Sequence, residues 1–114
     1  MDHALQSWNI QLRKGAADLA VMSLISRHPK SGAEIFEALL AYPAIGIAEG
    51  SIYPLLSRLE REKKIVGAWH ASTKGTRNQK IYRLTNTGRT LLTHMRAIWS
   101  DFHVQLTAAQ QSSE

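Results

Sequence analysis

The chain has 114 residues, so we expect one domain with a modest core, which a partner subunit would help to bury. It has no cysteine, which excludes disulfides and thiolate metal sites and fits a reducing cytoplasm, where we expect the protein to work. No apolar run could span a membrane, the first residues do not resemble a signal peptide, and the net charge of +5 is compatible with a polyanionic partner.

The first expected helix spans about residues 4–27. Gly15 is a candidate interruption, in which case the part that contains Trp8 forms a separate turn, so residues 1–11 are treated as a helical N-terminal extension. A helix that is apolar on most sides is usually buried. The apolar residues that give this pattern are Leu12, Ala16, Leu19, Leu24 and Ile25.

The second helix has a clear start signal, because Ser31 and Glu34 fit the S-x-x-E capping box. It should end near Tyr42, since Pro43 disfavours helix in the residue before it. A third helix is expected over residues 48–64, with Pro54 close to its start because an interior proline costs about 3 kcal/mol. Its inner stripe consists of Ile52, Leu55, Leu56 and Leu59, and its outer face shows Ser51, Tyr53, Ser57, Arg58 and Arg61.

Two β-branched and aromatic stretches follow, "KIVGAWHAS" and "QKIYRLT". They flank a turn-rich segment with Gly75 and Asn78, which predicts a β-hairpin with a long loop. The last helix is expected over residues 86–106, followed by a flexible tail at 107–114. The fold class is therefore mainly α with a small β-hairpin: a winged helix-turn-helix domain at 12–85 and a C-terminal dimerisation helix.

The charge distribution gives the hairpin loop a candidate role. No acidic residue occurs between Glu62 and Asp101, although this stretch is rich in lysine and arginine. A basic loop can be no more than a solvated surface, but such a loop has no reason to exclude acids. We therefore interpret the loop as a wing that contacts phosphates through Lys74, Arg77, Asn78 and Lys80, with Arg83 left as a structural strand residue.

Several motifs in a fixed order resemble the PadR family of bacterial transcription regulators. They are "LRKG" at 12–15, "SGAEI" at 31–35, "GSIYPLLSRLEREKKI" at 50–65 and "GTRNQKIYRLTNTGRTLL" at 75–92. The resemblance covers roughly residues 12–106, and the single C-terminal helix is similar to that of the small subfamily. Two positions depart from the family pattern: Ala33, where members often have tyrosine, and Thr76, where they often have a second wing glycine.

The resemblance implies a homodimeric repressor whose third helix enters the major groove of double-stranded DNA while the wing grips the flanking backbone. The operator is then an inverted repeat, with ATGT-like half-sites about 34 Å apart. Arg58 has an alternative partner in Glu62 at i+4 spacing. The implied contacts are Ser51, Tyr53, Pro54, Ser57 and Arg58 in the recognition helix, and Lys74, Thr76, Arg77, Asn78 and Lys80 in the wing.

Many members of the family respond to phenolic acids, drugs or other small aromatic compounds. The candidate residues here are Trp99 with Met95, Ile98 and Phe102, and Trp8 on the first helix. They form either the dimer core or a pocket for a planar aromatic effector between paired tryptophans.

Other function classes find little support. No two of the five histidines share an i, i+4 spacing, so we expect no metal and no cofactor. Glycine-rich phosphate loops and nucleophile elbows are missing from the sequence, so we expect no enzyme. The alternative function is a winged-helix protein-interaction module without DNA binding, for which a wing of mixed charge or with an apolar patch would be typical.

Overall fold

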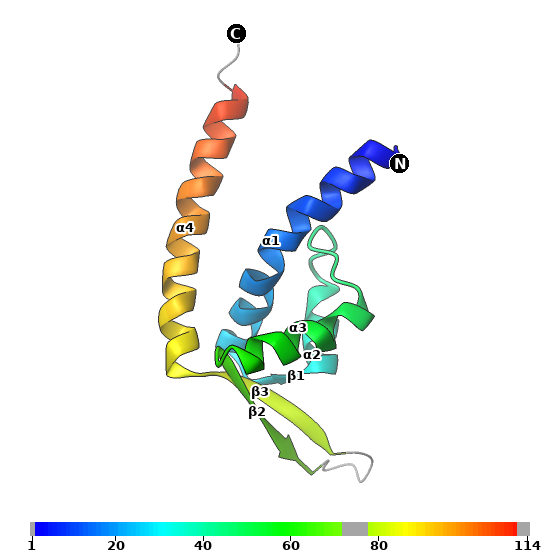
Figure 1. Ribbon diagram of the computed structural model, residues 1–114, viewed down its shortest axis with the longest axis vertical. Coiled ribbons are helices and arrows are strands. Elements are labelled where there is room, and N and C mark those ends of the chain that lie inside the picture. The colour runs from blue at the N-terminus through cyan, green and yellow to red at the C-terminus, as the bar shows by residue number, and fades with distance from the viewer. Residues whose placement is uncertain (1, 72–77, 112–114) are drawn as a thin grey trace.

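The computed structural model describes residues 2–71 and 78–111 (Figure 1). Within these residues, four helices accompany a three-stranded antiparallel sheet with strand order β1-β3-β2. The β2–β3 hairpin projects from one end of the body, and α4 extends away from the body beside α1 (Figure 1). This confirms the expected fold class, although the sequence does not predict the short first strand. The elements are α1 (His3–Arg27), β1 (Lys30–Ser31), α2 (Gly32–Leu39), α3 (Glu49–Arg61), β2 (Ile65–His70), β3 (Gln79–Leu84) and α4 (Asn86–Gln111).

Helix α1 runs unbroken through Gly15, so the N-terminal extension is not a separate turn. Only its C-terminal half is buried, where Val21, Met22, Leu24 and Ile25 join the core. Its N-terminal half reaches beyond the body, as Figure 1 shows, and its apolar side chains are exposed. The expectation that this helix would be buried on most sides is therefore wrong for the first half.

Helix α2 begins with the predicted capping box. Ser31 N donates to Glu34 Oε1 at 2.8 Å, and Glu34 N donates to Ser31 Oγ at 3.1 Å. The helix ends at Leu39, but hydrogen bonds between residues three apart continue to Tyr42, whose N donates to the carbonyl oxygen of Leu39 at 2.9 Å. The α-helix therefore ends before the predicted position near Tyr42, and turns with this shorter hydrogen-bond spacing cover the difference.

Helix α3 packs its predicted inner stripe into the core, with Ile52, Leu56 and Leu59 fully buried. Pro54 lies in the second turn, so the carbonyl of Gly50 receives no helical hydrogen bond from it. After α3 the chain turns sharply at Lys63, which has a φ of 63°.

Thr85 caps the start of helix α4, because its hydroxyl accepts a hydrogen bond from Gly88 N at 2.9 Å. The helix continues to Gln111, so residues 107–111 are helical and α4 extends beyond the expected end at residue 106. Its first turns pack on the core through Leu92, while the rest projects outward.

Candidate nucleic-acid interface

The outward side of α3 is polar. The side chains of Ser51, Tyr53, Pro54 and Ser57 are exposed, whereas the apolar residues between them are buried or half-buried. Two hydroxyls and a phenol are thereby presented on one side of this helix. Groups of this kind can hydrogen-bond to base edges or phosphates in a major groove.

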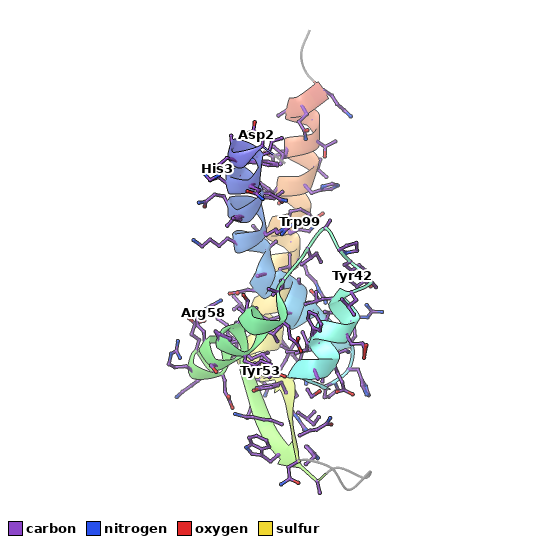
Figure 2. All side chains as sticks on the ribbon, turned by 90° about the vertical axis from the view of Figure 1, so that its right-hand side faces the viewer. Asp2, His3, Tyr42, Tyr53, Arg58 and Trp99 are labelled. Atoms are coloured by element: carbon purple, nitrogen blue, oxygen red, sulfur yellow. The ribbon has the colours of Figure 1, made fainter. Side chains whose placement is uncertain are left out.

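Tyr53 lies on the side of α3 that faces α2 (Figure 2). Its ring packs against Gly32, the first residue of α2, where an added Cβ would lie 2.5 Å from Tyr53 Cε1. Glycine at position 32 therefore permits this close approach. The tyrosine stays 51% exposed, so its ring is supported on one side and free on the other.

Arg58 lies on the other side of α3 and is tied to α1 (Figure 2). Its Nη2 donates to Asp18 Oδ1 at 2.6 Å and its Nη1 to Asp18 Oδ2 at 3.2 Å, with a further contact from Nη1 to Glu62 Oε1 at 3.3 Å. The hydrogen bonds to Asp18 raise the pKa of Arg58 above its ordinary value. The sequence indicated the Glu62 partner but not Asp18, since no local pattern links residues 18 and 58.

Lys80 lies near the loop end of β3, opposite Trp69 on β2, and its side chain reaches back over Gly67 to α3. Its Nζ donates to Glu60 Oε1 at 3.0 Å, and Glu60 Oε2 also accepts from the backbone N of Gly67 at 3.2 Å. The hydrogen bond to Glu60 raises the pKa of Lys80, and burial raises the pKa of the neighbouring Tyr82. One carboxylate of α3 therefore holds both strands of the hairpin.

The remaining wing residues are placed as far as the structure allows. Asn78 is exposed directly before β3, and Lys74, Thr76 and Arg77 lie outside the described residues. Trp69 on β2 is 69% exposed and pairs in register with Lys80, whose Nζ lies 6.0 Å from the Trp69 ring centroid. No pattern in the sequence distinguishes Trp69, because an aromatic residue in a strand is usually half-buried.

A second exposed surface is apolar and lies on the projecting parts of α1 and α4. Trp99 is 45% exposed, with its ring centroid 6.0 Å from that of Phe102 and 5.5 Å from that of His103. Met95, in contrast, packs against the core. Exposed apolar side chains that gather on projecting helices are typical of interaction sites. Its members are Leu5, Trp8 and Leu12 on α1 and Ile98, Trp99, Phe102 and Leu106 on α4, hereafter the apolar stripe.

The described ranges, 2–71 and 78–111, contain neither a metal-ligand cluster nor a membrane-spanning helix. Within them, no three histidine, aspartate or glutamate side chains gather as metal ligands. The helices in these ranges are too polar or too short to cross a bilayer.

The sequence model of a protein family, the "Transcriptional regulator PadR-like family", matches residues 21–94 of this chain. The fold is similar to that of a PadR-like transcriptional regulator from Bacillus cereus, with a TM-score of 0.81 and 30% sequence identity over 90% of this chain and 99% of that one. A transcriptional regulator from Streptococcus gives a TM-score of 0.78 at 27% identity, covering 88% of this chain and 97% of the other. A PadR family regulator from Eggerthella lenta shares the fold, with a TM-score of 0.81 at 24% identity over 96% and 95% of the two chains. A search of the curated proteins gave no match.

Proposed function

Because the chain belongs to the PadR-like family of transcriptional regulators, we propose that it is a homodimeric repressor that binds an inverted-repeat operator and leaves it when a planar aromatic effector binds. The observation that carries the proposal is the polar, exposed face of α3 beside a hairpin that Glu60 fixes to the same helix.

In this proposal α3 is the recognition helix. Ser51, Tyr53 and Ser57 hydrogen-bond to bases or phosphates, and Pro54 makes apolar contact with a thymine methyl group. Arg58 keeps α3 at a fixed angle to α1, because its guanidinium is bound to Asp18 of α1; a second contact joins it to Glu62 at the end of α3 itself. Tyr53 contributes to specificity, since close packing against the backbone at Gly32 limits the positions of its ring.

The wing supplies contacts to the flanking backbone. Asn78 and the residues of the loop, Lys74, Thr76 and Arg77, are the proposed phosphate ligands. Lys80 has a different role, because its ammonium group is bound to Glu60. It sets the angle between the hairpin and α3, so the tip approaches the DNA in a fixed register with the recognition helix.

The apolar stripe supports the proposed dimer. Its side chains lie on two projecting helices, and Ile98 is 69% exposed. An isologous contact around a two-fold axis would bury the stripe of both subunits and place two copies of α3 for the two half-sites of a palindrome. Sedimentation at micromolar concentration should show a dimer, and a stable monomer would contradict this arrangement.

Trp99 is the proposed centre of the effector site. In a two-fold dimer the two Trp99 rings lie near the axis, where a planar molecule can stack between them. The effector releases DNA only if it binds more tightly to a dimer whose recognition helices are wrongly spaced for the operator, because equal affinity for both states shifts nothing. Trp99→Ala should abolish fluorescence quenching by planar aromatic compounds while the dimer stays intact.

Selection from random duplexes tests the DNA-binding proposal without a known operator. Wild-type protein should enrich an inverted repeat with half-sites about 34 Å apart. Tyr53→Ala should relax the enriched sequence, whereas the matched control Tyr42→Ala, an exposed tyrosine beyond α2, should leave it unchanged. Failure of the wild type to bind any duplex would favour the protein-interaction module.

A further inference from the structure

A groove of about 640 Å³ lies between α1, residues 45–48 and α3. It is open to solvent, and its walls carry four cationic side chains, Arg13 and Lys14 from α1 and Arg58 and Arg61 from α3, but only one carboxylate, that of Asp18. Arg58 takes this carboxylate at 2.6 Å. Within the described residues the other three cations have no carboxylate within 4 Å, so the groove keeps their positive charge.

The groove and the wing flank α3 on opposite sides. Ser51, Pro54, Arg58 and Arg61 follow one another at helical spacing and line the groove. Tyr53 and Glu60 form the other stripe, which contacts Gly32 of α2 and the hairpin. The proposed recognition surface therefore continues without a gap into the groove.

The loop at residues 43–47 holds Arg13 at the groove wall without neutralising it. Gly46 has a φ of 57°, and an added Cβ there would lie 2.9 Å from both Cζ and Nη1 of Arg13. Arg13 Nε is buried and has no hydrogen-bond partner in the described part of the chain. Packing, and not ion pairing, keeps this cation in place.

We propose that the groove binds the sugar-phosphate backbone of the DNA strand on the side of α3 opposite to the wing. This inference rests on the proposed DNA binding. A major groove is about 12 Å wide and an α-helix with its side chains is about 10–12 Å across, so a helix that enters it lies close to both bordering strands. The wing faces one strand, and Arg13, Lys14 and Arg61 face the other.

The open shape of the groove favours a backbone over a small ligand. A drug-sized ligand loses most of its surface to a pocket, which an open groove cannot provide. Successive phosphates along a strand, in contrast, need only a row of cations at the surface. Lys14 and Arg61 are exposed and can reach such a strand without any rearrangement of the protein.

The test compares Lys14→Gln and Arg61→Gln with the matched control Arg89→Gln, which removes an exposed cation from α4. Affinity for a selected operator and for an unrelated duplex is measured by fluorescence anisotropy over a range of salt concentrations. Each groove variant should bind several-fold more weakly, by a similar factor on both duplexes. The slope of log K against log salt should become shallower by about 0.9 for each phosphate that the variant no longer neutralises.

The outcomes separate this inference from the proposed function. Wild-type protein without salt-dependent duplex binding would refute DNA binding itself. If wild-type protein binds DNA with salt-dependent affinity, groove variants whose affinity and salt slope equal those of Arg89→Gln would refute only the role of the groove. Weaker binding with an unchanged slope would also overturn the groove proposal, because the side chain would then affect the shape of the protein and not contact a phosphate. Thermal unfolding of each variant checks that the fold is intact.

Discussion

Two helical glycines should respond in opposite ways to alanine. Gly15 lies in the middle of α1, and an added Cβ there meets nothing within 4 Å. Gly88 lies in the first turn of α4, where an added Cβ would overlap the carbonyl oxygen of Lys64 and lie 3.0 Å from its carbonyl carbon. The same substitution therefore tests helix propensity at one site and close backbone packing at the other.

The magnitudes follow from these surroundings. Gly15→Ala should raise the free energy of unfolding by up to about 1 kcal/mol, because alanine is the better helix former. Gly88→Ala has the same advantage in helix propensity, but the backbone of Lys64 must move away. That movement strains the hydrogen bonds from Thr85 N to Lys64 O at 3.1 Å and from Thr85 Oγ1 to Lys63 O at 2.7 Å. Overpacking costs about 1–3 kcal/mol and removal of a helix cap about 1 kcal/mol, so a net destabilisation of about 1–3 kcal/mol is expected.

Urea denaturation followed by circular dichroism measures both changes. Protein concentration must be equal for all variants, because the stability of the proposed dimer would depend on it. Gly15→Ala should shift the midpoint upward and Gly88→Ala downward, with similar m-values. If Gly88→Ala were as stable as the wild type, the close contact between α4 and the end of the α3–β2 turn would not exist.

Three further predictions concern local features. Ser31→Ala removes the capping box and should lower the free energy of unfolding by about 1 kcal/mol in urea titrations, whereas Ser26→Ala in the last turn of α1 should change it less. Lys63→Gly should raise it by about 1 kcal/mol in the same assay, because glycine adopts the φ of 63° without strain. The pKa values of Lys80 and Tyr82 are raised in the folded protein. Above about pH 10 the folded protein therefore binds more protons than the unfolded chain. The free energy of unfolding should fall as pH rises through that range. Denaturation at pH 9, 10 and 11 should show a smaller decrease in stability for Tyr82→Phe than for the wild type.

Local sequence signals predicted most of the fold. The Ser31–Glu34 pair indicated the start of α2, and the β-branched stretches around the turn-rich segment indicated β2 and β3. These elements depend on contacts between residues close in sequence, so their patterns survive in a single chain. Strand β1 could not be found in this way, because a pair of residues has no periodicity and is defined only by its register with Ile81 and Tyr82 of β3.

The candidate interface was harder to predict where it depends on contacts between distant residues. Asp18 and Arg58 meet only because α1 and α3 cross, and Lys80 reaches Glu60 only because the hairpin folds back on α3. Neither pair has a spacing that sequence analysis could use. The sequence therefore groups Lys80 with the loop cations of the wing and gives no sign that its ammonium group pairs with Glu60.

The arrangement of α4 offers a physical route between the proposed effector site and the proposed DNA surface. Gly88 brings the first turn of α4 against the backbone of Lys64, directly after α3, and Thr85 hydrogen-bonds to both Lys63 and Lys64. In the proposed dimer, a rotation of α4 would therefore move the end of α3 with it, because Lys63 and Lys64, which follow α3, are hydrogen-bonded to Thr85 at the start of α4. The two recognition helices would change their spacing as rigid bodies, and Gly88→Ala, which loosens this contact, should weaken the response of DNA binding to an aromatic effector more than it weakens DNA binding itself.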